Sequence, residues 1–287
     1  LENGQAVINV GTLTADVENA GTVTAGTGTL TFNGAVAGNG GTFSGDSLTF
    51  SGVTSGTAAV EAADVTYNGT DSQSVFGGTY GTLTLDGGIK TVTGKTEVTG
   101  KFTNNSGVQV DGSLTLNGVE GVGEYLVSQN GMLVFNGDGT VAGSVTNSGT
   151  VEVNALVSFG GGLSNLATGT LNLNATGLNV TADNAGVINV NAQNVTLSGS
   201  NSKTVNVADG GSLTLKMTDA AGANYTVAAG GVLNLDSASG TLFGRVDNAG
   251  TFNVISVVDS FVGGVSNSGT MVVESASNLA NVTNSNL

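Results

Sequence analysis

The chain has 287 residues, including 48 glycines, and contains no histidine, cysteine, proline or tryptophan. Without histidine and cysteine it cannot build Ser-His-Asp or Cys-His catalytic triads, and it lacks the ligands of nearly all zinc sites, so we expect no cofactor and no metal. Its formal net charge of −15 repels nucleic acid and anionic lipid. No apolar run is long enough to span a bilayer, so we expect no direct insertion into a membrane.

Pairs of apolar residues alternate with polar ones through residues 1–85. The pairs follow one another at almost equal steps and are Leu13/Ala15, Leu30/Phe32, Leu48/Phe50, Val65/Tyr67 and Leu83/Leu85. Alternation predicts strands with one buried face, and a fixed short period predicts one strand-bearing coil repeated along an axis. The first segment of the chain is therefore expected to be a stack of coils.

Threonine dominates the outward positions of these first coils. The outward pairs are Thr12/Thr14, Thr29/Thr31, Ser47/Thr49, Asp64/Thr66 and Thr82/Thr84. Ice-binding solenoids present flat threonine arrays, so ice binding through this face is one alternative function. Threonine is also a favoured outward strand residue, and Asp64 interrupts the array.

The regular spacing fails between residues 86 and 111. Lys90, Lys95 and Lys101 gather there, with Tyr80 nearby, and the three lysines are half of the six basic residues. We expect an irregular stretch, either a bulge or a coil that carries a loop. Because loops of solenoids often carry recognition, these four residues are candidate contacts for a partner.

From residue 112 to residue 287, the phrase Gly-x-apolar-x-apolar occurs nine times. It opens at Gly112, Gly131, Gly149, Gly169, Gly186, Gly211, Gly231, Gly250 and Gly269. The longest step, from Gly186 to Gly211, holds an Asn- and Ser-rich segment, in which Asn201 and Lys203 are further candidate loop contacts. The remaining steps are nearly equal and predict regular coils.

Asparagine stands two residues before the opening glycine in several copies, as Asn147, Asn184, Asn248 and Asn267. Asparagine tolerates left-handed backbone, and amides stacked at one corner can bond from coil to coil. We therefore predict a structural asparagine corner. Sugar binding by the same amides is an alternative.

A coil of about 17–20 residues divides into three short strands and three corners, which gives a triangular cross-section. The sequence therefore predicts an all-β, single-domain β-solenoid, or parallel β-helix, over the whole chain. Because the first residue is leucine and not methionine, we expect the chain to be a fragment of a longer polypeptide.

The repeats resemble those of secreted bacterial β-helix adhesins. The phrases that carry this resemblance are Asn147-Ser148-Gly149-Thr150-Val151, Asn184-Ala185-Gly186-Val187-Ile188, Asn248-Ala249-Gly250-Thr251-Phe252 and Asn267-Ser268-Gly269-Thr270-Met271. They are similar to repeats of filamentous-haemagglutinin-type exoproteins and autotransporter passenger domains. The resemblance implies a right-handed parallel β-helix displayed outside a bacterial cell, and it covers most of the chain.

The predicted function is that of a non-catalytic structural or adhesive segment of a bacterial surface or secreted protein. Its expected partners are host glycans, surface proteins or a second copy of itself. The alternative from another class is a polysaccharide-acting β-helix enzyme, which would need carboxylates on adjacent coils. Arg245, Asp247 and Asp236 are the only such grouping around an arginine, and a chain with no tryptophan offers few aromatic platforms for sugars.

Overall fold

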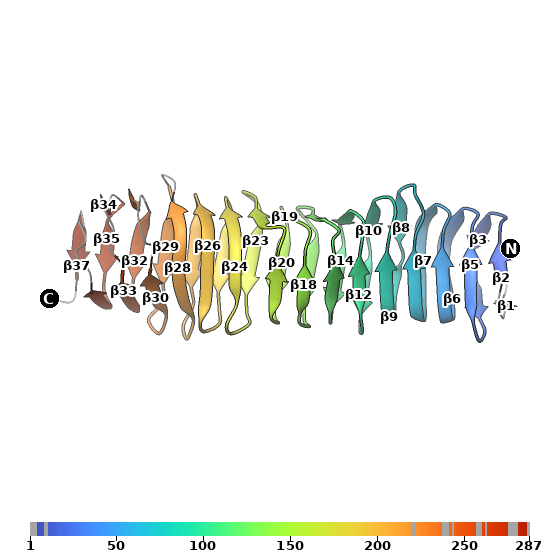
Figure 1. Ribbon diagram of the computed structural model, residues 1–287, viewed down its shortest axis with the longest axis horizontal. Coiled ribbons are helices and arrows are strands. Elements are labelled where there is room, and N and C mark those ends of the chain that lie inside the picture. Colours follow the sequence, from blue (N-terminus) through green and yellow to red (C-terminus); the bar gives the residue numbers. More distant parts are fainter. Residues whose placement is uncertain are drawn as a thin grey trace. The chain divides into compact units, whose positions relative to one another are not determined.

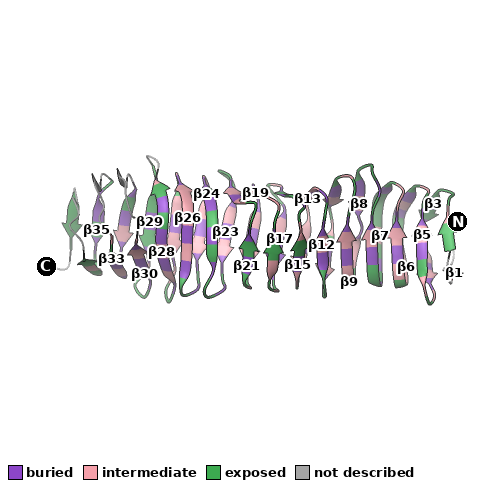
Figure 2. Cartoon of the chain, in the orientation of Figure 1, coloured by how far each residue is buried: buried purple, intermediate pink, exposed green. Residues whose placement is uncertain are grey.

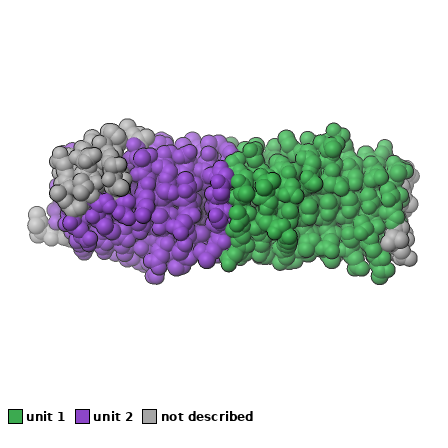
Figure 3. Space-filling view, viewed as in Figure 1, with its two compact units in different colours: residues 1–145 green, residues 146–287 purple. Residues whose placement is uncertain are grey.

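The computed structural model describes residues 5–8, 11–219, 222–236, 241–242, 244–256, 260–261, 263–274 and 281–285. These residues form strands and turns with no helix, and the strands pair in parallel as a β-solenoid of about 14 turns (Figure 1). The prediction of an all-β parallel solenoid is confirmed. The chain divides into two compact units, residues 1–145 and residues 146–287 (Figure 3).

Each coil of unit 1 passes through three faces, called first, second and third in chain order. The first face contains β1 (Gln5–Ile8), β4 (Thr22–Ala25), β11 (Lys95–Val98), β14 (Ser113–Leu116) and β17 (Met132–Phe135). The second face contains β2 (Gly11–Leu13), β5 (Thr29–Phe32), β12 (Phe102–Asn104), β15 (Val119–Gly121) and β18 (Gly139–Val141). The third face contains β3 (Val17–Asn19), β8 (Gln73–Val75), β10 (Lys90–Val92), β13 (Val108–Val110) and β16 (Tyr125–Val127).

Three long strands of unit 1 continue around the corners between faces. They are β6 (Val36–Phe50), β7 (Thr54–Tyr67) and β9 (Gly77–Leu85). Glycine makes such a bend possible at Gly56, where β7 leaves the third face for the first; φ is +79° there, and an added Cβ would lie 2.3 Å from the carbonyl oxygen of Gly38. A side chain at this corner would collide with the neighbouring coil.

Unit 2 repeats the same order of three faces. Its first face contains β20 (Thr150–Val153), β23 (Thr170–Leu173), β25 (Val187–Val190), β27 (Thr204–Val207), β29 (Asn224–Val227), β32 (Arg245–Asn248), β35 (Val265–Asn267) and β37 (Val282–Asn284). Its second face contains β21 (Val157–Phe159), β30 (Val232–Leu235), β33 (Thr251–Val254) and β36 (Thr270–Val273). Its third face contains β19 (Val145–Asn147), β22 (Leu163–Asn165), β31 (Thr241–Leu242) and β34 (Ser260–Phe261). The strands β24 (Asn179–Asn184), β26 (Val195–Asn201) and β28 (Ser212–Asp219) run from the second face into the third.

Residues 86–111 form regular coils, which differs from the irregular stretch expected there. Strand β11 pairs in register with β9 before it and β14 after it, and β10 pairs with β8 and β13. The spacing breaks because the repeated phrase moves to another face. It lies on the second face up to Leu83/Leu85, and on the first face from Leu114/Leu116.

The long step between Gly186 and Gly211 in unit 2 has the same origin. Ile188 pairs with Val205 on the first face of the very next coil, whereas the next copy of the phrase, at Leu213, lies on the second face. Strand β26 occupies the supposed loop and pairs with β24 and β28. No loop is inserted among these residues.

The register of the first coils is shifted from the sequence-based prediction. Leu13 pairs with Phe32 and not with Leu30, and Thr12 pairs with Thr31. The first step is therefore longer than the alignment of apolar pairs indicates. Thr14 follows the end of β2, so it does not belong to the outward row of that strand.

The core lies inside the coils, where alternate residues of most strands are buried (Figure 2). In unit 1, Phe32 stacks on Phe50 with ring centroids 5.1 Å apart, and Phe50 stacks on Tyr67 at 4.8 Å. Phe43 and Phe76 stack at 5.6 Å. Phe32, Phe50 and Tyr67 are in register on successive coils, so ring packs directly on ring in this row.

Candidate functional site

The six candidate contact residues divide into two groups. Tyr80, Lys90 and Asn201 are fully buried. Lys95, Lys101 and Lys203 are exposed. The prediction that these residues share contact loops is therefore wrong for the first group, since a buried side chain cannot meet a partner.

Tyr80 belongs to a buried aromatic cluster. Its hydroxyl donates to the carbonyl oxygen of Phe76 at 2.5 Å and lies 3.3 Å from the hydroxyl of Tyr67, which accepts from the backbone N–H of Phe76. Burial raises the pKa of both tyrosines. The pair satisfies its own polar atoms inside the core, so its role is structural.

Lys90 is buried at a corner and bonds to the backbone of the turns there. Its Nζ donates to the carbonyl oxygens of Gly69 at 3.0 Å and Gly88 at 2.7 Å. Burial lowers the pKa of Lys90, and the nearby charge of Asp86 partly offsets that shift. Gln73, one coil earlier in the same row, likewise donates to the carbonyl oxygen of Phe50. Both polar side chains can therefore be buried, because backbone carbonyl oxygens accept their hydrogen bonds.

The exposed lysines make only surface contacts in the described structure. Lys101 forms an ion pair with Glu120 at 2.7 Å, with 61% and 50% of the two side chains exposed. The hydrogen bond from Lys101 lowers the pKa of Glu120. Such exposed pairs contribute little to stability, because solvent screens them. Lys95 opens β11, and Lys203 lies directly before β27.

The asparagine corner exists as two buried ladders in unit 2. In the ladder on the third face, Asn147 donates to Asn165, Asn165 to Asn184 and Asn184 to Asn201, each at 2.8 Å. In the ladder on the first face, Asn248 donates to Asn267 at 2.6 Å. Asn165 and Asn201 belong to the ladder although neither stands two residues before an opening glycine of the phrase, so the spacing of the phrase does not predict them there.

The ladder on the third face stops at Asp219, which pairs in register with Asn201. Tyr225 donates a hydrogen bond to Asp219 Oδ1. Asn201 Nδ2 and Asp219 Oδ2 are buried without a hydrogen-bond partner among the described residues. Burial raises the pKa of Asp219 to about 6, although the hydrogen bond from Tyr225 opposes the shift.

The outer surface of unit 1 carries one continuous threonine row on the second face. In register order it runs Thr12, Thr31, Thr49, Thr66, Thr84 and Thr103. The neighbouring row is mixed and runs Thr29, Ser47, Asp64 and Thr82. The predicted threonine face is therefore a single unbroken row beside an interrupted one.

The outer surface of unit 2 carries amide rows on its first face. Asn189 donates to Asn172 at 2.8 Å, and Asn206 donates to Asn189 at 2.9 Å. At the following corner, Asn174 donates to Asn154 and Asn191 to Asn174, each at 2.7 Å. These rows present amides at the interstrand spacing of about 4.8 Å.

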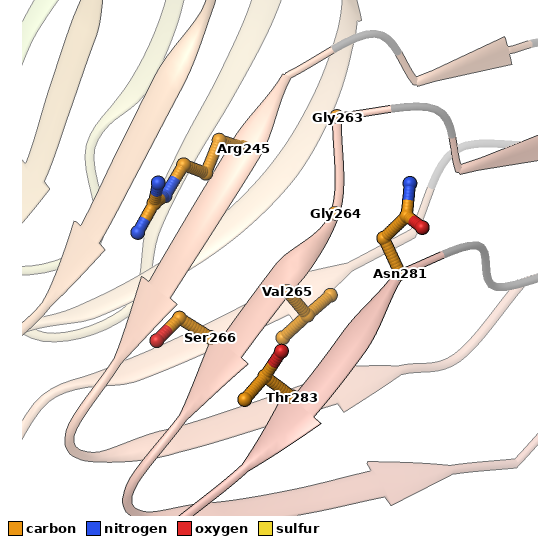
Figure 4. Close-up of a pocket in the computed structure, with 7 residues that line it drawn as sticks. All are labelled: Arg245, Gly263, Gly264, Val265, Ser266, Asn281 and Thr283. Carbon is orange, nitrogen blue, oxygen red and sulfur yellow. The ribbon is translucent and has the colours of Figure 1, made fainter.

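A polar hollow of about 270 Å³ lies on the same face of unit 2, around β32, β35 and β37. It is lined by Arg245, Gly263, Gly264, Val265, Ser266, Asn281 and Thr283 (Figure 4). Arg245 Nη2 lies 2.7 Å from Asp247 Oδ1, and Arg245 Nε donates to the same oxygen at 2.8 Å. Asp236, the third member of the predicted grouping, pairs with Lys216 at 3.3 Å.

In the described part of the chain, no three acidic side chains gather as metal ligands would. The described residues also include no helix long and apolar enough to cross a membrane. No protein-family model, curated protein or solved structure matches the chain.

Proposed function

We propose that this chain is a non-catalytic structural and adhesive segment of a bacterial surface or secreted protein, which acts by displaying extended polar surfaces on a stiff scaffold. The observation that carries this proposal is the set of outward side-chain rows that continue from coil to coil. They are the threonine row of unit 1 and the amide rows of unit 2.

Scaffold stiffness supports the display role. Strands pair in parallel with the coil before and the coil after, and the interior combines stacked rings with amide ladders. Repeat proteins of this kind are stabilised by contacts between neighbouring repeats, and their extended surfaces serve for binding. Such a surface suits a long partner, for example a host glycan, a surface protein or another copy of the chain.

The carboxylates of the predicted catalytic grouping support a non-catalytic role. Asp247 is held by Arg245, and Asp236 accepts a hydrogen bond from Ser256 and pairs with Lys216. The hydrogen bonds from Ser256 and Lys216 lower the pKa of Asp236. A general acid for glycoside cleavage needs a raised pKa and a second carboxylate at a matched distance. The lowered pKa of Asp236 is the opposite of that requirement.

The proposal is tested with microspheres coated with the full chain. Clumping of the spheres, or retention on glycan-coated or protein-coated surfaces under flow, is expected to exceed that of spheres coated with an unrelated acidic protein. If the coated spheres neither clump nor adhere, the proposal is wrong. Release of reducing ends from polysaccharides would instead favour the enzyme alternative, and thermal hysteresis would favour ice binding.

A further inference from the structure

The hollow around Arg245 lies where β32, β35 and β37 begin. Val246, Val265 and Val282 pair across these strands, so the residues before them, Arg245, Gly264 and Asn281, are neighbours in three successive coils. Gly264 lies between the other two and adds only backbone to the lining (Figure 4). Its φ of +84° suits glycine, and an added Cβ would lie 3.3 Å from the Cβ of Asn281, so the close approach of the two coils favours a residue without a side chain.

An outward row supplies hydroxyl groups. Asp247, Ser266 and Thr283 are in register on the same three strands. The hollow is thus lined by a guanidinium, an amide, two hydroxyls, Val265 and the glycines Gly263 and Gly264 (Figure 4). The carboxylate of Asp247 is bonded to the guanidinium. These groups include both donors and acceptors of hydrogen bonds.

We propose that this hollow binds a neutral sugar residue, such as the end or a branch of a glycan chain. This inference rests on the proposed adhesive function and names the chemistry of one contact. A sugar is dense in hydroxyls that both donate and accept, which matches the mixed lining. The volume of about 270 Å³ lies just below the roughly 300 Å³ at which ordinary ligand pockets begin, so the hollow suits one small ring.

Charge selects a neutral sugar over an acidic one. Arg245 is held by Asp247 through two contacts to Oδ1, so the formal charges of the pair sum to zero. A ligand carboxylate would face the Asp247 carboxylate as well as the guanidinium, on a chain of net charge −15. Hydroxyl groups make charge-assisted hydrogen bonds with either member of the pair and incur no such repulsion.

The test uses the full chain and soluble methyl glycosides of neutral hexoses, with glucuronic acid as the acidic probe and a short uncharged peptide as the peptide probe. Binding is followed by chemical-shift changes at the amides of Gly263, Gly264 and Ser266. A neutral glycoside is expected to move these signals, and the acidic sugar and the peptide are expected to bind more weakly.

Two variants change the hollow, and a third variant serves as the control. Arg245→Ala removes the guanidinium and is expected to weaken binding at least about tenfold, the loss that follows from deleting a charge-assisted hydrogen bond. Ser266→Phe fills the hollow from an outward strand position, where an aromatic residue is well tolerated, and is expected to abolish binding. Lys216→Ala removes a similarly exposed cation from an ion pair elsewhere in unit 2 and is expected to bind as the parent chain does.

The site is overturned if no neutral glycoside moves these amides, if the acidic sugar or the peptide binds more tightly, or if both site variants bind like the parent chain. The sphere assay separates this result from the proposed function. Adhesion that persists in Arg245→Ala without sugar binding leaves the function standing and places the contact elsewhere. Sugar binding by a chain whose spheres never adhere leaves the site standing without the function.

Discussion

Units 1 and 2 build the same three-faced coil around different interiors. Unit 1 stacks aromatic rings, as in Phe32, Phe50 and Tyr67, whereas unit 2 stacks mainly aliphatic side chains and joins buried corner amides, such as Asn165 and Asn184, into a ladder. In both units, in-register coils place each residue over its equivalent in the next coil. The same coil geometry therefore accommodates different kinds of interior side chain, provided that equivalent positions in successive coils carry side chains that pack on one another.

The largest effect is expected from the aromatic interior of unit 1. Phe50→Ala removes a fully buried ring that stacks on Phe32 and Tyr67, so we expect a loss of about 3–5 kcal/mol in the free energy of unfolding. Thr49→Ala, the adjacent outward residue, is the matched control and should cost less than about 0.5 kcal/mol. Hydrogen exchange of amides in unit 1, read residue by residue, measures both. Equal losses in the two variants would contradict the stacked core.

The second-largest loss of stability is expected from the buried amide ladder of unit 2. Asn184 accepts from Asn165 Nδ2 and from the backbone N–H of Gly186, and it donates to Asn201 and to the carbonyl oxygen of Thr204. Asn184→Ala leaves several of these buried groups without partners, so we expect a cost of about 3 kcal/mol. Hydrogen exchange in unit 2 reports it.

Asn189→Ala provides the matched comparison on the outside of the same unit. Asn189 bonds to Asn172 and Asn206 in an outward row, where water can replace the lost partner. The expected cost is below about 1 kcal/mol. If Asn189→Ala costs as much stability as Asn184→Ala, the claim that the buried ladder stabilises the unit more than the exposed row is wrong.

A pH-dependent effect is expected where the buried ladder meets Asp219. The pKa of this carboxyl is raised from 3.8 to about 6 in the folded chain, so the folded state keeps a proton that the unfolded state loses at lower pH. Stability from this group is present below about pH 4 and is lost as the pH rises to about 6. The loss is roughly 3 kcal/mol, since each unit of pKa shift corresponds to about 1.4 kcal/mol.

Asp219→Asn isolates that contribution. An amide at this position has no charge to bury, and its oxygen lies in the row where Asn201 Nδ2 lacks a partner among the described residues. We expect the variant to be more stable than the parent chain above pH 6 and to lose that advantage near pH 4, as measured by urea unfolding of the two chains side by side. A constant difference across this range would show that Asp219 does not titrate as described.

Much of the fold follows from the sequence, because alternation and period are local properties. Alternation identifies Leu114/Leu116 and Leu213/Leu215 as inward pairs, and both pairs are buried. The face on which each pair lies is not a local property. The phrase moves from the second face to the first in unit 1, and from the first face to the second in unit 2, which the sequence shows only as irregular spacing.

Two of the candidate contacts are buried for a related reason. Lys90 and Tyr80 are polar or amphipathic residues near an apparent break, and both satisfy acceptors inside a regular coil. Only the register shows that Lys90 follows Gln73 in an inward row. The hollow at Arg245 was likewise not predicted, because it depends on Gly264 and Asn281, which lie one and two coils later. The single arginine of the sequence could have drawn attention to this place, but the residues that complete the hollow become its neighbours only when the coils stack.

The smallest effect is expected on the threonine row of unit 1. Thr66→Val keeps the β-branched shape and removes one hydroxyl from an outward position, so stability should change by less than about 0.5 kcal/mol. We also expect no thermal hysteresis from either chain, because the row is a single side chain wide and its neighbour carries the charged Asp64. Thermal hysteresis in the parent chain that falls in Thr66→Val would show that this row is a functional face. It would also make unit 1, and not unit 2, the unit that carries recognition.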